Sequence, residues 1–149
     1  MLLSEIFNEH SIKLNLEADT KEAVFWELIE TMADVHPALD KTEMFSAIQD
    51  RERKMSTAVT SGVAVPHGYY PGTNGIFGAI GISQDGIAYN ALDNEPIHFV
   101  FLLLMGESAR EEHLRTLNRV LSLIHSGALA SMRTAQNVRE VSDILSRFR

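Results

Sequence analysis

Apolar residues gather in four short stretches that are typical of β-strands. Ser11–Leu16 alternates apolar and polar residues with period two, which indicates a half-buried strand. Val63–Val65 and Ile76–Ile82 are short apolar runs of strand length. Ile97–Leu104 is so continuously apolar that we expect it to be covered on both faces and to lie centrally in its sheet.

Two helices are predicted between the first and second of these stretches. Asp19 and Glu22 form a capping-box-like start, and His36-Pro37 stops the helix. Between them, four apolar residues recur at helical spacing: Val24, Leu28, Met32 and Val35. Asp40 repeats the start signal for a second helix that reaches about Arg53.

Three further helical segments are predicted in the last third of the chain. Ser108 and Glu111 open a long helix, whose expected apolar stripe is Leu114, Leu117, Leu121 and Ile124. Gly127 breaks this helix. Two shorter helical segments follow, the last from about Val138 to Phe148.

The order of these elements predicts the fold class. Ser56–Gly62, which is small and polar, is expected to be a loop, and Gly72–Gly75 a turn. The chain then runs strand, two helices, three strands and three helices. This order predicts an α/β fold: a three-layer α/β/α sandwich with a mixed β-sheet flanked by helices on both faces. At 149 residues, we expect a single domain spanning 1–149.

Composition excludes several classes of function. The formal charge of -7, with no compensating basic cluster, argues against a nucleic-acid partner. The chain has no cysteine, so it has neither disulfides nor a thiolate site. The acidic N-terminus lacks the features of a signal peptide, and the longest apolar run, Phe99–Met105, is too short to span a bilayer. We therefore expect no membrane insertion and a cytoplasmic location.

The segment Gly62–Gly68 holds the strongest candidate for chemistry. Pro66 fixes its own φ and favours extended backbone at Val65, while Gly68 is expected to let the chain turn sharply past the preceding ring. His67 is therefore held in a defined direction at the edge of a strand. Such an imidazole suits proton transfer, metal ligation or nucleophilic attack on a phosphoryl group.

The other histidines differ in what their positions indicate. His113 lies just beyond the first turn of the long helix, near an N-terminus that favours anions, and with His67 it suggests a phosphate site. A metal site would need a third donor, and no HExxH or HxH pattern is present. From the residues alone, phosphate, metal and purely structural roles all stay open. His98 is expected to be a hydrogen-bonded core or edge histidine, and three others to be surface residues: His10, His36 and His125.

The sequence around His67 resembles a known family. Gly62–Gly68 resembles the active-site signature of the enzyme IIA domains of the fructose and mannitol class in the bacterial phosphoenolpyruvate-dependent phosphotransferase system. This class includes the nitrogen-regulatory enzyme IIA proteins. Arg51–Thr57 resembles the family's Arg-Glu-x-x-x-Ser-Thr segment, and Arg51 lies 16 positions before His67, as in the family pattern.

The resemblance continues towards the C-terminus. Ala91–Leu104 is similar to the family's Asp-x-x-Pro-Val turn and central strand, and Glu112–Leu117 matches the segment that carries the family's second histidine, here His113. Thr60 departs from the pattern, which has Gly or Ala at this place. The matching segments cover nearly the whole chain.

The resemblance implies a reversible phosphoryl relay. A phosphohistidine on an HPr-like carrier would deliver its phosphoryl group to His67, in the family usually at Nε2. Arg51 and His113 would stabilise the phosphoryl oxygens, and the hydroxyls of Ser56 and Thr57 would either contact the phosphate or cap the loop. The resemblance implies no cofactor and no metal. By composition alone, Arg51 would be part of a solvated charge run.

Partners and biological role follow from the same resemblance. The implied partners are an HPr-like carrier and an enzyme IIB or regulatory target proteins, which need an apolar, shallow docking face around His67. Tyr69, Tyr70 and Met55 fit either that face or the core. Because no fused enzyme IIB or IIC segment is present and the Asp93–Pro96 turn is, the sequence leans to the nitrogen-regulatory branch. The alternative is a fructose/mannitol-type sugar-transport enzyme IIA; a metallohydrolase lacks its donor set.

Overall fold

A mixed β-sheet forms the middle layer of the protein. The computed structural model describes residues 2–54, 58–60, 62–89, 95–107 and 110–148. Within them the sheet has six strands, with the order β1-β5-β6-β3-β2 and with β4 also paired to β6. The strands are β1 (Ile12–Lys13), β2 (Ala58–Thr60), β3 (Val63–Ala64), β4 (His67–Tyr69), β5 (Ile76–Ile87) and β6 (Ile97–Met105). Pairing is antiparallel between β5 and β6 and parallel for β1–β5, β3–β6 and β4–β6.

Strand β6 lies at the centre of the sheet, as its apolar sequence predicts. Its side chains alternate between two hydrophobic clusters, so that Phe99 and Phe101 face one cluster while Val100 and Leu102 face the other. All four are at most 6% exposed. A strand that is buried on both faces needs this unbroken run of apolar residues.

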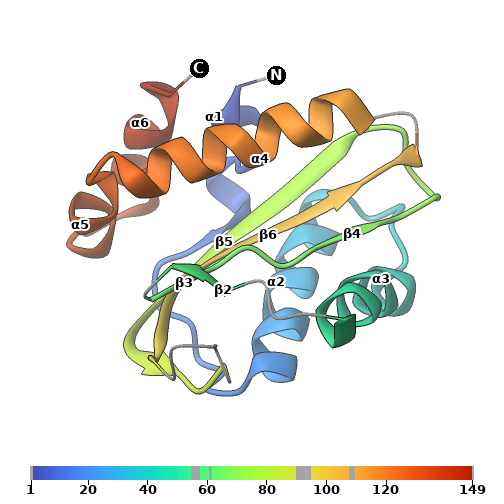
Figure 1. The fold of residues 1–149 in the computed structure, drawn as a ribbon, viewed down its shortest axis with the longest axis horizontal. Coiled ribbons are helices and arrows are strands. Elements are labelled where there is room, and N and C mark those ends of the chain that lie inside the picture. Colours follow the sequence, from blue (N-terminus) through green and yellow to red (C-terminus); the bar gives the residue numbers. More distant parts are fainter. Residues whose placement is uncertain (1, 55–57, 61, 90–94, 108–109, 149) are drawn as a thin grey trace.

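Helices cover both faces of the sheet, which confirms the predicted three-layer arrangement (Figure 1). One layer consists of α2 (Lys21–Val35) and α3 (Lys41–Lys54). The other contains α1 (Leu3–Ile6), α4 (Arg110–His125), α5 (Ala128–Arg133) and α6 (Val138–Ser146). A short 3₁₀-helix, Glu9–Ser11, precedes β1. The sequence patterns did not predict this turn or α1.

Several predicted boundaries are wrong. The alternating segment from Ser11 forms a strand only over β1, since Ser11 belongs to the 3₁₀-helix. Residues 58–60 of the expected loop form β2, which pairs with β3. Strand β5 continues past Ile82 to Ile87 through an irregular pairing with β6. For β2 and for the end of β5, the pairing with another strand decides the structure.

The predicted starts of α2 and α3 are correct to within one residue. The N-cap of α2 is Thr20 rather than Asp19, because the Thr20 hydroxyl accepts from the Ala23 N–H at 3.3 Å. For α3, the Asp40 carboxylate accepts from the Glu43 N–H at 3.0 Å, as predicted. The predicted cap Ser108 lies outside the described residues.

The apolar stripe expected on α4 is correct for Ile124, which is buried, but wrong for Leu114. Leu114 is 65% exposed, and Leu117 and Leu121 are only partly buried. The buried face of α4 consists of His113, Thr116, Val120, Leu123 and Ile124. His113 and Thr116 therefore occupy the inward face of the first turns, and Leu114 lies at the surface.

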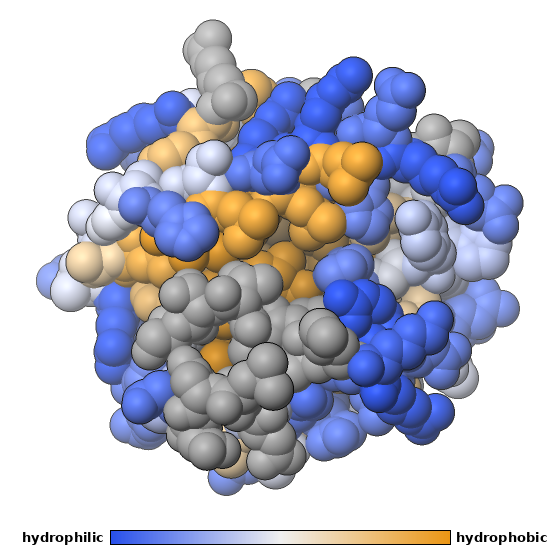
Figure 2. All heavy atoms as spheres, in the orientation of Figure 1, coloured by the Kyte–Doolittle hydropathy of each residue, from blue (hydrophilic) through white to orange (hydrophobic). Residues whose placement is uncertain are grey.

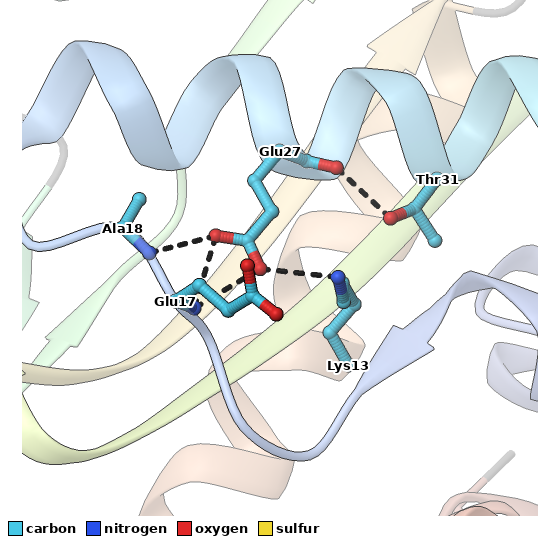
Figure 3. A network of polar contacts seen from close by, with 5 residues as sticks. All are labelled: Lys13, Glu17, Ala18, Glu27 and Thr31. Carbon is cyan, nitrogen blue, oxygen red and sulfur yellow. Dashed lines mark hydrogen bonds and ion pairs between the residues drawn. The ribbon is translucent and has the colours of Figure 1, made fainter.

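A carboxylate anchors the segment after β1 to α2 (Figure 3). Glu27 accepts hydrogen bonds from the backbone N–H groups of Glu17 at 3.1 Å and Ala18 at 2.9 Å, and forms an ion pair with Lys13 at 3.2 Å. Burial raises the pKa of Glu27, but the two N–H groups and Lys13 outweigh this effect and hold the pKa below its ordinary value. The charged form of Glu27 therefore stabilises the folded chain.

Candidate functional site

Strand β4 fixes the position of His67. It pairs in parallel with β6, so that His67 lies opposite Leu103, and the Leu103 N–H donates to the carbonyl of Pro66 at 2.9 Å. The Nδ1 of His67 lies 2.9 Å from the carbonyl oxygen of Val65. Because a carbonyl can only accept, Nδ1 carries the hydrogen, and the neutral ring keeps its lone pair on Nε2.

Gly68 allows α3 to approach β4 closely. A Cβ on Gly68 would lie 2.6 Å from the carbonyl oxygen of Ala47, which is closer than real Cβ contacts. Gly68 is part of a strand and has no left-handed backbone, so the expectation that it turns the chain sharply is wrong. Its function is to leave room for α3, the helix that carries Arg51.

The ring of His113 lies beside that of His67. The two ring centroids are 5.6 Å apart and the ring planes meet at 89°. His113 is 8% exposed, and its buried Nδ1 has no hydrogen-bond partner among the described residues. The ring of Tyr69 lies 5.8 Å from that of His113 on a second side. With Nδ1 closed off by burial, Nε2 is the nitrogen through which His113 can bind a ligand.

These side chains line an open pocket of about 460 Å³. Its lining is Ala47, Asp50, Arg51, Lys54, His67, Gly68, Tyr69 and His113. The structure thus brings together three of the five predicted site residues. The other two, Ser56 and Thr57, lie outside the described residues, as does Met55.

Sequence reasoning missed the contributions of Asp50 and Lys54 to this pocket. The signal was present, because Ala47, Asp50, Arg51 and Lys54 follow the i, i+3, i+4, i+7 spacing of one helix face. Arg53 does not line the pocket, although it forms an exposed ion pair with the lining residue Asp50 at 3.8 Å.

The electrostatics of the pocket favour neutral imidazoles. Burial lowers the pKa of His67, and the carbonyl of Val65 raises it; Arg51 adds to the lowering, and Glu52 opposes it, so that the pKa falls below its ordinary value. Burial and the neighbouring His67 likewise lower the pKa of His113. Near neutral pH, His67 therefore has an available lone pair for nucleophilic attack.

The two tyrosines after His67 have different roles. Tyr69 is 49% exposed and lines the pocket, so it belongs to the surface. Tyr70 is 4% exposed, and its hydroxyl accepts from the Asp40 N–H at 3.0 Å, so it belongs to the core and holds the start of α3. The sequence alone had left both possibilities open for each.

The remaining histidines lie away from this pocket. His98 donates from Nδ1 to the carbonyl of Ser83 at 2.8 Å, as expected of a hydrogen-bonded edge histidine. His36 packs edge-on against Phe77, with ring centroids 4.2 Å apart. Over the described ranges, no three His, Cys, Asp or Glu residues are grouped so that they could hold a metal ion. In the same ranges, no helix is both long and apolar enough to cross a membrane.

Comparison with known proteins identifies the family. The family described as "Phosphoenolpyruvate-dependent sugar phosphotransferase system, EIIA 2" matches residues 5–148. The chain belongs to this family. As an EIIA protein it is a phosphotransfer component, a phosphocarrier, and the resemblance seen in the sequence is confirmed.

The relatives of this EIIA chain fall into two functional groups. It is 28% identical over 147 residues to a nitrogen regulatory protein of Bradyrhizobium diazoefficiens, covering 98% of this chain and 95% of that protein. It is 34% identical over 124 residues to the fructose-specific EIIABC component of Bacillus subtilis, covering 83% of this chain but 20% of that longer protein.

Solved structures show the same fold. The nitrogen regulatory protein IIA-Ntr of Neisseria meningitidis superposes with a TM-score of 0.88 at 28% identity, covering 96% of this chain and 98% of that one. The mannitol enzyme IIA of Escherichia coli, in complex with phosphorylated mannitol enzyme IIB, has a TM-score of 0.75 at 17% identity, covering 93% and 95% of the two chains. This second likeness supports the three-layer fold.

Proposed function

We propose that this EIIA protein accepts a phosphoryl group on Nε2 of His67 from a phosphohistidine on an HPr-like carrier protein. The observation that carries the proposal is the geometry of one pocket. In this pocket, Nδ1–H of His67 is hydrogen-bonded to a backbone carbonyl, and the ring centroid of His67 lies 5.6 Å from that of the buried His113. Arg51 lines the same pocket. The lowered pKa of His67 adds support, since the attacking ring must be neutral.

The phosphoryl transfer needs no proton to move, because the bonds and charges balance between the two imidazoles. The lone pair of His67 Nε2 forms the new N–P bond while the N–P bond of the donor's phosphohistidine breaks. The bonding electrons leave with the donor imidazole, which becomes neutral. The ring of His67 becomes a phosphoimidazolium that keeps its Nδ1–H on the carbonyl of Val65. This hydrogen bond persists throughout the transfer and keeps Nε2 directed at the phosphorus atom.

Arg51 and His113 stabilise the transferred group. Phosphoryl transfer passes through a loose transition state with charge spread over three oxygens, so catalysis depends on positioning and electrostatics. The Arg51 guanidinium offers a planar set of donors, and His113 donates from Nε2. The His113→Ala variant should therefore transfer more slowly by roughly 10² to 10³, the scale for the loss of one positioned donor, while His67 remains the acceptor.

An apolar surface beside the pocket suits a docking protein. Figure 2 shows an apolar area on the face that α4 crosses in Figure 1. On α4, Leu114 is 65% exposed, and Leu117 and Leu121 are partly buried. Exposed Tyr69 lies at the pocket itself. Exposed Leu114 and Tyr69 therefore fit a face on which a phosphoryl donor or acceptor protein would bind.

We assign the chain to the nitrogen-regulatory branch, where the phosphorylation state controls the binding of target proteins. The near-complete coverage of the Bradyrhizobium nitrogen regulatory protein and the TM-score of 0.88 with the Neisseria IIA-Ntr support this assignment. The 34% identity to the Bacillus fructose component favours the alternative, a transport protein that passes the group to an enzyme IIB. Either role operates in the cytoplasm. A neighbouring sugar permease gene would favour transport, and a neighbouring nitrogen-type sigma factor gene would favour regulation.

Reconstitution tests the proposal. The protein is incubated with phosphoenolpyruvate, enzyme I and HPr-like carriers, and mass spectrometry locates any phosphate. We expect one acid-labile phosphoryl group on His67, formed only when the carrier is present. Phosphorylation without the carrier, or no phosphorylation with any carrier, would contradict the proposed donor. Addition of an enzyme IIB then shows whether the protein passes the phosphoryl group on, as in transport, or keeps it, as in regulation.

A further inference from the structure

A second pocket lies at the start of β6, away from the phosphoryl site. It has a volume of about 380 Å³, similar to that of the His67 pocket. Its lining is Gly62, Val63, Glu95, Pro96, His98, Phe99, Leu129 and Arg133. His67 is in register with Leu103, and His98 lies five residues earlier on the same strand, so the two imidazoles are separated by roughly 17 Å of strand. In Figure 1, α5 and β4 lie at opposite ends of the sheet.

Two consecutive carbonyls of β5 hold the polar groups of this pocket. The carbonyl of Ser83 accepts from Nδ1 of His98 at 2.8 Å, and the carbonyl of Gln84 accepts from the guanidinium of Arg133 at 3.1 Å. The Gln84 side chain donates in return to the carbonyl of Arg133 at 3.0 Å. Arg133 is thus held from both its side chain and its backbone, which lowers the entropy cost of using it to bind a ligand.

The irregular part of β5 is built to receive the His98 ring. Gly86 has a left-handed φ of 92°, and its N–H donates to the Ser83 hydroxyl at 3.0 Å. A Cβ on Gly86 would lie 2.8 Å from Cβ of Pro96 and 3.2 Å from Cε1 of His98. The absence of a side chain at this position therefore lets the bulge close around the imidazole. A carbonyl partner on Nδ1 leaves Nε2 of the neutral ring as an acceptor.

The lining combines opposite charges with an apolar wall. Arg133 supplies a cation that matches a carboxylate, and Nε2 of His98 and the carboxylate of Glu95 supply acceptors for a donor group. Phe99 and Leu129 provide an apolar surface. The volume of the pocket lies within the range of small-molecule sites, and its charged and polar lining residues suit a polar ligand.

We propose that this pocket binds a small aliphatic carboxylate that carries a hydrogen-bond donor, a hydroxyl or an ammonium group, next to the carboxylate. The carboxylate pairs with Arg133, the donor group bonds to His98 and Glu95, and the aliphatic chain packs on Phe99 and Leu129. The site is independent of phosphoryl transfer. Strand β6 contributes His98 and Phe99 to this pocket, and its other end pairs with β4, the strand that carries His67.

Four probes of similar size test the ligand chemistry by NMR titration of the whole protein, observed at the His98 ring and the Arg133 guanidinium. They are L-leucine, 2-hydroxy-4-methylpentanoate, 4-methylpentanoate without the donor, and 3-methylbutylamine without the carboxylate. We expect saturable shifts with one or both of the first two, weaker binding of the third and none of the fourth. Binding of the amine as tight as that of leucine, or no saturable shift with any probe, would overturn the proposal. Inorganic phosphate is a fifth probe. Binding of phosphate as tight as that of leucine would also overturn the proposal, because the pocket would then be a site for anions in general.

Two arginine variants test whether probe binding depends on the pocket or only on the total positive charge of the protein. Arg133→Gln should weaken binding of the best probe by at least about tenfold. Arg139→Gln removes the same charge from an exposed residue that pairs with Glu9 and Asp143 outside the pocket, and should leave binding unchanged. Both residues are exposed, so the variants are expected to fold. Equal weakening in the two variants would refute a site at Arg133.

Discussion

Gly68 of β4 lies against the backbone of Ala47 in α3, so closely that a Cβ on Gly68 would be 2.6 Å from the Ala47 carbonyl oxygen. His67 directly precedes this contact, and Arg51 lies one helical turn after Ala47. The absence of a side chain on Gly68 therefore lets the helix that carries Arg51 come close to the strand that carries His67.

Gly68→Ala should disturb both the fold and the site. The added methyl group must push α3 away from β4, so we expect a loss of about 1–3 kcal/mol in the free energy of unfolding, measured by urea denaturation. Phosphoryl acceptance by the folded variant should also be slower. Gly75→Ala is the matched control, because its Cβ would meet Phe77 at an ordinary 3.7 Å. Equal effects in the two variants would show that the close contact is unimportant.

Arg51→Lys tests whether Arg51 acts through its shape or only through its charge. Lysine keeps the charge but loses the planar set of donors, so we expect phosphoryl transfer to slow by at least roughly tenfold, about 1.4 kcal/mol of barrier. The measurement is the rate of phosphorylation by the carrier.

The control for Arg51 comes from the same helix. Lys54 lines the pocket, so its removal is not a neutral comparison. Arg53 is exposed and does not line the pocket, although it pairs with Asp50, and Arg53→Gln should change the rate by less than about twofold. Similar losses in Arg51→Lys and Arg53→Gln would mean that general electrostatic attraction suffices.

Glu52→Gln should make His67 less basic. Glu52 is buried and forms an ion pair with Lys21 at 3.2 Å, and its charge raises the pKa of His67 against the effects of burial and Arg51. Removing this charge should lower the pKa of His67 further, as followed by an NMR titration of the ring.

Asp50→Asn provides the comparison for Glu52. It removes an equal charge from the adjacent position, but Asp50 is 72% exposed and screened by water. The pKa of His67 should therefore shift less in Asp50→Asn than in Glu52→Gln. The reverse order, or a rise of the pKa in Glu52→Gln, would contradict the electrostatic account of the site.

Glu27→Gln should change how stability depends on pH. The folded-state pKa of Glu27 lies below its ordinary 4.5, so the charged carboxylate stabilises the fold above that pH, and this contribution is lost as the pH falls through the lower folded value. The wild type should therefore be more stable than the variant at neutral pH, with a difference that shrinks below about pH 4.5.

Unfolding by urea at several pH values measures this difference. Glu30→Gln, at an exposed position of the same helix, should show no such trend. The lowered pKa values of His67 and His113 make every variant lose stability as the pH falls below 6.5, so only the difference between variants is informative. A difference that stays constant down to acid pH would contradict the role given to Glu27.

Local patterns in the sequence were sufficient for most of the architecture. The unbroken apolar run of β6 predicted a central strand because only a strand buried on both faces needs it. Asp40 predicted the start of α3 because its side chain caps the adjacent backbone. In the site, the register between Arg51 and His67 came from the family resemblance, and the structure places both residues on one pocket.

The features that sequence reasoning missed depend on contacts between distant segments. Strand β2 is only three residues long, Ala58–Thr60, within a segment of mostly small residues, and it forms through its pairing with β3. On α4, His113 and Thr116 take buried positions while Leu114 is exposed, which the hydrophobic pattern did not indicate. The steric role of Gly68 depends on the backbone of Ala47, 21 residues earlier.

A comparison of two histidine variants tests the central claim most directly. His67 and His98 both donate from Nδ1 to a backbone carbonyl, so both present Nε2 as the nucleophilic nitrogen, but only His67 lines the pocket with Arg51 and His113. The measurement is acid-labile phosphorylation of His67→Ala and His98→Ala by the HPr-like carrier, with the folded state of each variant checked by circular dichroism. We expect no phosphohistidine in His67→Ala and wild-type incorporation in His98→Ala. Phosphohistidine in folded His67→Ala would contradict the assignment of His67 as the acceptor.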